Sequence, residues 1–230
     1  MDERTRALLN SLSTATLTSQ LLKRGFRNTF IAGLQATQPG IRLLGTAYTL
    51  RYAPSREDMD MSVDYNNDTN VQRIAVESIE EGQVLVIDAR GEVSAASFGH
   101  IIATRIMRRG AAGLVTDGAL RDSHRFGQLD FPAYFRAAHA TTSAVLHHPV
   151  DLNVPIGCGG VLVLPGDVLV GDPEGIVVIP RAIAPEVAAG AAEQERLEEF
   201  IWEKVNAGSP IRGVYPPDEV TRREFDARRP

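Results

Sequence analysis

The chain has 230 residues, 43% of them hydrophobic, which is enough to bury one full core, and one compact domain is the simplest organisation. Its 24 basic and 29 acidic residues leave a net charge of −5, which argues against nonspecific nucleic-acid binding because that needs a basic field. The single Cys158 excludes an internal disulfide framework and fits a reducing compartment.

The first half of the chain predicts helices that alternate with buried strands. Leucines at helical spacing predict a helix over 5–24, interrupted by the polar residues 13–16 and ended by Gly25. The charged start of the chain does not resemble a secretory leader, and no apolar run is long enough to span a bilayer, so we expect a cytoplasmic protein. Further along we expect a strand over 43–51, a polar surface segment over 53–70, a helix over 71–80 and a buried strand over 84–88.

The second half predicts tightly turned β structure followed by one long helix. Short strands separated by Gly, Pro and Asp turns are expected over 131–135, 143–146, 154–157, 161–164, 168–170 and 175–179. The long helix begins after Pro180 and ends near Asn206. We therefore assign one domain to 1–206 and regard 207–230 as a proline- and charge-rich tail that packs on a neighbouring subunit or frays.

Between these halves lies the stretch SFGHIIATRIMRRGAAGLVTDGALRD, residues 97–122. A small polar residue and a glycine turn, Ser97–Gly99, precede an amphipathic helix that Gly110 closes. Residues 113–116 then predict a short buried strand, followed by a turn at Asp117–Gly118. The stretch ends in the charged pair Arg121–Asp122 at the exit of that strand.

This layout has a chemical meaning. The free backbone amides at the start of the helix, on His100, Ile101 and Ile102, attract a carboxylate or a phosphate. Arg121 can grip a planar carboxylate through two parallel hydrogen bonds, and Asp122 can hold a divalent cation. Ordinary loop charges are the alternative, and spacing alone does not decide between the two.

The stretch resembles the signature of the RraA-like family, which includes 4-hydroxy-4-methyl-2-oxoglutarate aldolases and the RraA regulators of ribonuclease E. The enzymes' pattern is an acidic residue, twenty intervening residues and then Arg-Asp, and Arg121–Asp122 match its end. His100 stands at the acidic position, and Ser94 stands where the enzymes carry a glycine. Similar order and spacing extend over most of the chain, at 13–17, 45–49, 165–167, 171–172, Gly175 and 179–180.

The resemblance implies an α/β fold, the swivelling β/β/α-like domain with a compact β core flanked by helices, assembled as a homotrimer or a dimer of trimers. It implies substrate binding through Gly99, His100, Ile101, Ile102 and Arg121. Arg121 and His100 are the implied catalytic residues, and Asp122 is the implied anchor for Mg²⁺ or Mn²⁺, largely through waters. The substrate would be a 2-oxo acid such as pyruvate, oxaloacetate or a hydroxylated oxo-diacid.

The predicted function is a divalent-metal-dependent lyase that cleaves a carbon–carbon bond of such an acid through a pyruvate enolate, by retro-aldol reaction or by decarboxylation. Only Lys23 and Lys204 are available for a Schiff base, and both lie near the polar ends of predicted helices. Metal polarisation of the carbonyl is therefore the expected chemistry.

Two alternatives stay open. One is a non-catalytic regulator that binds a ribonuclease or another protein, which the loss of the acid at His100 supports. The other is a sugar-acid lyase that differs only in substrate. His100 itself has three open roles: it acts as the acid/base, it shapes the pocket while another subunit supplies the base, or it marks lost catalysis.

Overall fold

The computed structural model describes residues 1–60 and 68–228, and its largest sheet is built on the long strand β3 (Leu43–Pro54). The sheet order is β1-β14-β13-β3-β4-β6-β8-β2, and β10 also pairs with β3. Strands β3, β4, β6 and β8 are parallel, whereas β13 and β14 continue the sheet antiparallel. The other strands of this sheet are β1 (Phe30–Ile31), β2 (Gln35–Ala36), β4 (Gln83–Asp88), β6 (Gly113–Thr116), β8 (Ala133–Phe135), β10 (His147–Leu152), β13 (Val168–Asp172) and β14 (Gly175–Ile179).

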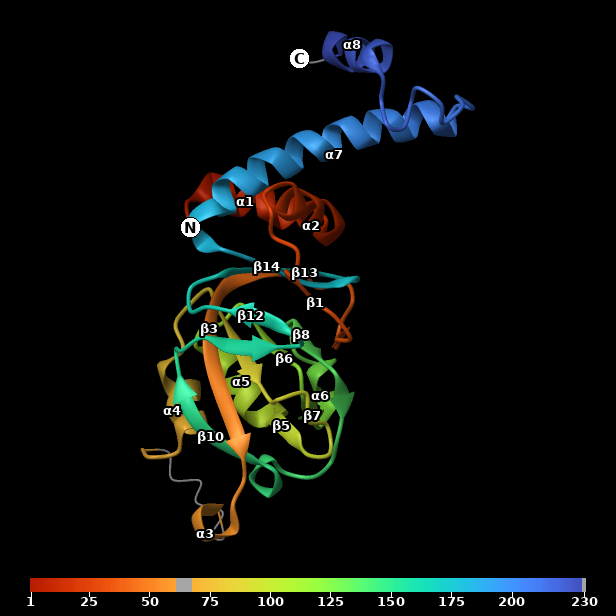
Figure 1. Ribbon diagram of the computed structural model, residues 1–230. Coiled ribbons are helices and arrows are strands. Elements are labelled where there is room, and N and C mark those ends of the chain that lie inside the picture. Colours follow the sequence, from red (N-terminus) through yellow and green to blue (C-terminus); the bar gives the residue numbers. More distant parts are fainter. Residues whose placement is uncertain (61–67, 229–230) are drawn as a thin grey trace.

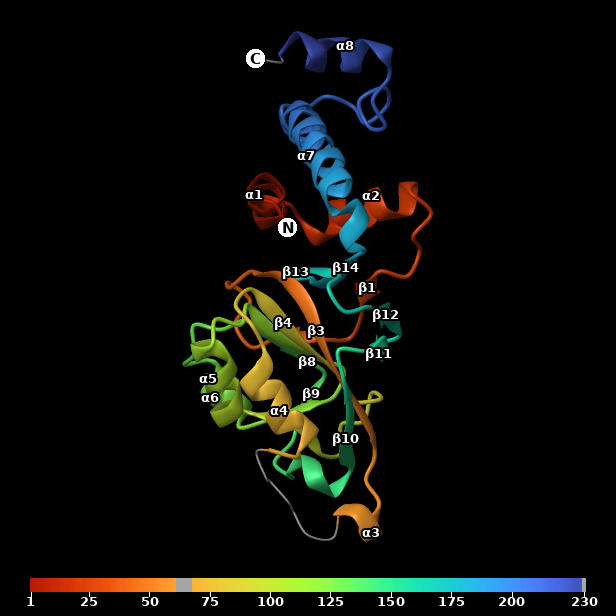
Figure 2. The ribbon, with the colours of Figure 1, turned by 90° about the vertical axis from the view of Figure 1, so that its left-hand side faces the viewer.

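Helices cover the sheet at two places, which confirms the predicted α/β class. The first group is α1 (Glu3–Ser11), α2 (Thr14–Lys23) and α7 (Ala184–Asn206), which lie over β13 and β14 (Figure 1). The second group is α4 (Val71–Ser78), α5 (His100–Arg108) and α6 (Ser123–Phe126), which pack on one side of the sheet (Figure 2). The hairpin of β11 (Ile156–Cys158) and β12 (Val161–Val163) covers the other side. Apolar side chains of β4 are buried because both faces are covered.

Asp172, at the end of β13, fastens the N-terminal helices to the sheet. Its side chain is 8% exposed and accepts hydrogen bonds from the backbone N–H and the hydroxyl of Thr14, both at 2.8 Å, and from the N–H of Glu174 at 2.9 Å. Thr14 is the first residue of α2, so this carboxylate fixes where that helix begins.

We expect Asp172→Ala to lower the free energy of unfolding by about 2–4 kcal/mol, because a buried donor left unpaired costs about 1–3 kcal/mol. Urea unfolding followed by circular dichroism measures the change. Asp58→Ala is the matched control, since Asp58 is exposed and forms an exposed ion pair with Arg56, and it should change stability by no more than about 0.5 kcal/mol. Equal stability of the two variants would show that Asp172 does not anchor α2.

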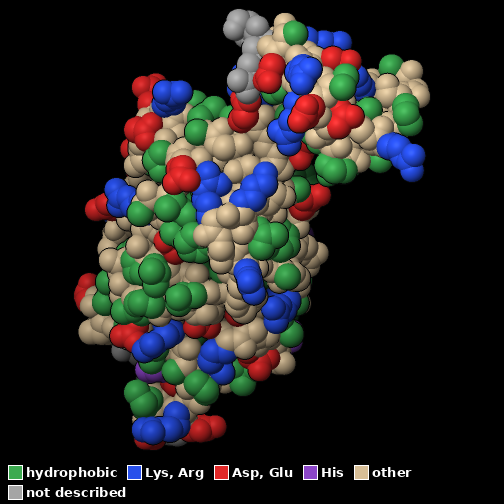
Figure 3. Space-filling view, turned by 45° about the horizontal axis from the view of Figure 1, so that its top comes forward, with side chains coloured by type: hydrophobic (Ala, Val, Ile, Leu, Met, Phe, Trp, Pro, Cys, Tyr) green, Lys and Arg blue, Asp and Glu red, His purple; other side chains and the backbone are tan. Residues whose placement is uncertain are grey.

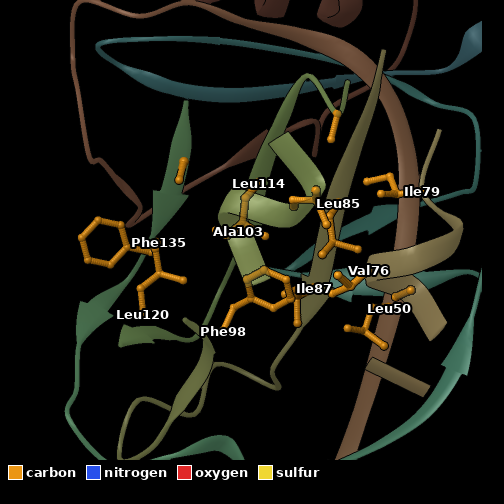
Figure 4. Close-up of a cluster of buried hydrophobic side chains, with 14 of the residues drawn as sticks. Leu50, Val76, Ile79, Leu85, Ile87, Phe98, Ala103, Leu114, Leu120 and Phe135 are labelled. Atoms are coloured by element: carbon orange, nitrogen blue, oxygen red, sulfur yellow. The ribbon is translucent and has the colours of Figure 1, made fainter. Parts of the chain in front are cut away.

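A second, parallel sheet carries the residues singled out in the sequence. It consists of β5 (Ala96–Gly99), β7 (Ala119–Arg121) and β9 (Ala137–Ala138). Phe98 of β5 and Leu120 of β7 are buried in the core shown in Figure 4, and Phe126 of α6 belongs to the same cluster. The prediction of a glycine turn at 97–99 is wrong: this segment is a strand, because β7, which the sequence did not reveal, pairs with it.

The strand expected over 143–146 is also wrong. Residues Ser143–Val145 form a 3₁₀ helix, η1, and the chain becomes extended only at β10. The reason is the ladder with β3, which starts at His147 opposite Pro54. The segment expected to be polar surface over 53–70 begins with the end of β3 and the short helix α3 (Glu57–Asp60), and residues 61–67 lie outside the described part of the chain.

The tail over 207–230 contains a helix that the sequence analysis did not assign. After α7 ends at Asn206, as expected, helix α8 (Glu219–Ala227) folds back on it (Figure 1). Phe225 of α8 packs on Phe200 of α7 with 5.7 Å between ring centroids, so these residues pack within their own chain. Acidic and basic side chains are interspersed over this end of the molecule (Figure 3). None of the described helices is both long and apolar enough to cross a membrane.

Candidate active site

The register of the small sheet creates the site. Gly99 of β5 lies opposite Arg121 of β7 in a parallel ladder. His100 and Asp122, the residues that directly follow these two strands, therefore lie side by side at the same edge of the sheet. The His100 Nδ1 and the Asp122 Oδ2 are 2.9 Å apart, at hydrogen-bonding distance. Two segments separated by twenty residues in sequence are thus joined through one side-chain contact.

Helix α5 begins at this edge with Gly99 as its N-cap. Gly99 has no side chain with which to cap the helix, so the amides of the first turn can bind a ligand. Ala103 and Ile106 are fully buried and hold the helix on the core, whereas Ile101 is 73% exposed beside the opening. The helix N-terminus predicted from the sequence is confirmed, and Gly110, with φ of +88°, closes the helix as expected.

Asp122 adopts a left-handed backbone conformation, with φ of +57°. Aspartate tolerates this region better than most residues, and the sharp turn leads the chain from β7 directly into α6. Phe126, at the end of α6, is fully buried in the hydrophobic core and so anchors the segment that follows the turn. The Arg121 Nε lies 4.0 Å from the Asp122 Oδ2, so this oxygen is close to both a guanidinium and an imidazole.

All the residues that the sequence pointed to lie around one cavity of about 310 Å³. They are Gly99, His100, Ile101, Ile102, Arg121 and Asp122. Sequence reasoning missed other lining residues: Gln72 and Arg73 from α4, and Thr142 and Ser143 at η1. These four have no spacing relation to the signature, and they reach the cavity only because α4 and η1 pack against β5.

Among the described lining residues, Asp122 is the one whose carboxylate could hold a cation that keeps most of its own waters. In the described part of the chain, no group of three or more His, Cys, Asp or Glu side chains could enclose a metal. Asp122 supplies a carboxylate at the cavity, and magnesium characteristically binds through one or two carboxylates while retaining waters. The donor set therefore suits Mg²⁺ or Mn²⁺ better than a zinc ion that needs several nitrogen or sulfur ligands.

A family model described as RraA-like, Aldolase/RraA, matches residues 14–178. The chain belongs to the RraA-like family. The match covers the large sheet as far as Val178 of β14, the small sheet of β5, β7 and β9, and the cavity. It ends before α7, so α7 and α8 lie beyond the part that the family model describes.

Relatives within the RraA-like family carry two kinds of name. A provisionally named 4-hydroxy-4-methyl-2-oxoglutarate aldolase of Halalkalibacterium halodurans is 38% identical over 55% of this chain and 61% of its own length. A relative of the same provisional name from Ectopseudomonas mendocina is 32% identical over 54% of this chain and 76% of its own length. A solved structure from Streptomyces coelicolor, described as an unusual member of the RNase ES inhibitor RraA family, has 33% identity and a TM-score of 0.77.

The Streptomyces structure covers 87% of this chain and 96% of its own, so the RraA-like fold predicted from the sequence is confirmed. The alignment with the Halalkalibacterium relative covers less than two thirds of that protein's length. The names agree with an RraA-like protein of either kind and do not distinguish between an aldolase and an inhibitor of a ribonuclease.

Proposed function

We propose that this protein is a divalent-metal-dependent lyase that cleaves a carbon–carbon bond of a 2-oxo acid through a pyruvate enolate. One observation carries the proposal: the N-terminus of α5, Arg121 and Asp122 converge on one cavity. An anion-binding helix end beside an arginine and a cation-binding carboxylate is what a pyruvyl group requires. The aldolase names of two relatives agree with this reading.

Each element has a defined task in the proposed reaction. The amides of the first turn of α5 bind the substrate carboxylate, and Arg121 holds the carboxylate or the adjacent carbonyl oxygen. Asp122 would hold Mg²⁺ or Mn²⁺, which supplies Lewis-acid stabilisation of negative charge when bound. The C3–C4 bond breaks and its electron pair moves into the pyruvyl group to form the enolate. In retro-aldol cleavage the 4-hydroxyl loses its proton and leaves as a carbonyl product, whereas in decarboxylation C4 leaves as CO₂. A proton added at C3 then gives pyruvate. The same enolate serves both retro-aldol cleavage and loss of CO₂.

In the proposed reaction His100 moves a proton. A neutral imidazole that donates from Nδ1 to the Asp122 carboxylate carries its lone pair on Nε2, which can accept a proton. Asp122 thereby orients the ring as a carboxylate orients histidine in many sites. In this reading His100 takes the place of the acid found in the related enzymes.

The deciding experiment measures pyruvate and CO₂ formed from oxaloacetate by purified protein in Mg²⁺ buffer. Buffer with Mg²⁺ alone gives the uncatalysed rate to subtract, and Arg121→Ala is the control for catalysis at this cavity. Rates above background that disappear in the variant are expected. Background rates for the wild-type protein with oxaloacetate and with a 4-hydroxy-2-oxo diacid would rule out the proposal.

A second candidate, a regulator that binds a ribonuclease, is favoured by His100 at the acidic position and by the RNase ES inhibitor family to which the Streptomyces relative is assigned. The two candidates predict opposite effects of His100→Glu. If the protein is a lyase that uses His100, His100→Ala should lower kcat by about 100-fold, in the range for general acid–base catalysis. His100→Glu should retain part of the rate. An inert wild-type protein made active by His100→Glu would favour the regulator.

The assembly and surroundings of the protein also stay predictions. We expect a homotrimer or a dimer of trimers in the cytoplasm, with no nucleic-acid partner. The exposed Ile101 at the mouth of the cavity is consistent with a neighbouring subunit at this edge. A residue donated across such an interface would add to the site described here.

A further inference from the structure

The cavity holds a second arginine that no part of the proposed mechanism uses. Arg73, on the first turn of α4, lines it together with Arg121, which comes from the end of β7. Among the described lining residues, the other ionisable side chains are His100 and Asp122, and these two contact each other. Arg73 is therefore a positive charge brought to the cavity by an independent element.

The backbone of Arg73 is held in place by its neighbours. The adjacent Gln72 is only 4% exposed, and its Nε2 donates to the Tyr52 hydroxyl at 2.6 Å and to the Ser97 carbonyl oxygen at 3.0 Å. The Tyr52 hydroxyl also donates to the Ser97 carbonyl oxygen, at 2.9 Å. Burial raises the pKa of Tyr52, which keeps this hydroxyl neutral and able to donate. Asn70 caps the helix by accepting from the backbone N–H of Arg73 at 3.2 Å.

These contacts tie α4 to the strand that leads into the anion-binding helix end. Ser97 lies on β5, which ends at Gly99. The first turn of α4 and the start of α5 are therefore both attached to β5. Side chains carried on such rigid elements bind with more defined geometry than side chains on loops. The backbone positions from which the two arginines extend are therefore set by the fold.

We propose that Arg73 determines substrate specificity by binding the distal carboxylate of a 2-oxo dicarboxylic acid. The pyruvyl carboxylate occupies the α5 amides and Arg121, and a planar guanidinium is suited to a second carboxylate. The cavity of about 310 Å³ is at the lower end of the range for pockets that enclose whole small molecules, which leaves room beyond a three-carbon acid. The inference rests on the proposed function only in placing the pyruvyl end.

The experiment compares two five-carbon ligands that differ at one end, 2-oxoglutarate and 2-oxopentanoate, by calorimetry in Mg²⁺ buffer. The wild-type protein should bind the diacid at least about 10-fold more tightly, because a charge-assisted hydrogen bond is worth one to two powers of ten in affinity. Arg73→Met should lower the affinity for the diacid about 10- to 100-fold and leave the affinity for the monoacid unchanged. Arg73→Lys should recover part of the difference. Arg108→Met, which removes an equal charge from the exposed end of α5, should change neither affinity.

The outcomes separate this inference from the lyase proposal because binding needs no turnover. A preference for the diacid that is lost in Arg73→Met supports the distal site even if the protein never cleaves a substrate. Absence of diacid binding or of any preference in the wild type, or a preference that survives in Arg73→Met, overturns it even if the protein is an active lyase. If Arg73→Met loses affinity for both ligands to the same extent, Arg73 has a merely structural role, and this result also overturns the inference. Thermal unfolding checks each variant, and Arg73→Gln replaces Arg73→Met if the latter does not fold.

Discussion

Arg121→Lys should lower kcat/KM for oxaloacetate by about 30- to 900-fold, although the charge is retained. Lysine is a point charge and lacks the planar fork that binds two carboxylate oxygens at once. Loss of one preorganised donor to the reacting group costs about 2–4 kcal/mol, and each 1.36 kcal/mol is a factor of ten in rate. The Arg121 side chain is half exposed and is not part of the core, so the loss should appear in catalysis and not in folding.

The matched control for this variant is Arg125→Lys. Arg125 is exposed on α6, next to the site in sequence, but it does not line the cavity. Steady-state kinetics and urea unfolding of both variants give the comparison. Near-normal kcat/KM in a stable Arg121→Lys protein would place Arg121 outside the reacting centre and remove the main support for the mechanism.

Chelation of divalent cations should abolish turnover, and added Mg²⁺ or Mn²⁺ should restore it. The reason is that the described structure offers no lysine for a Schiff base. Lys23 lies at the end of α2 and donates to Gln194 at 2.7 Å, and Lys204 of α7 forms an ion pair with Glu224 of α8. Neither lysine lines the cavity. In the proposed mechanism a metal therefore takes the role that a Schiff-base lysine has in other aldolases.

The measurement is oxaloacetate decarboxylation after dialysis against EDTA, followed by titration with each cation. Asp122→Asn is the paired variant, since an amide keeps the shape of the side chain but removes its negative charge. It should need a much higher cation concentration for half-maximal rate. Full activity in chelator would refute the metal mechanism, and a pyruvyl-lysine adduct trapped by borohydride would contradict it independently.

Several local features of this protein could be predicted because they depend on neighbouring residues. Gly110 ends α5 by taking a positive φ that other residues avoid, and the apolar run in β4 is buried on both faces of a parallel sheet. The start of α5 at His100 follows from the capping position of Gly99. By contrast, the sequence analysis did not assign α8, whose Phe225 packs on Phe200 of α7, a residue twenty-five positions earlier in the chain.

By itself the sequence determined the start of a helix at His100 and an Arg-Asp pair after twenty intervening residues, but that pair lies at the end of β7 and not at the exit of the 113–116 strand as predicted. Tertiary structure alone decided how these groups meet. The pairing of Gly99 with Arg121 in a parallel ladder puts His100 against Asp122, and the buried Gln72 brings Arg73 to the same cavity. Strand register and helix docking depend on side chains far apart in the chain, and so local periodicity cannot specify them.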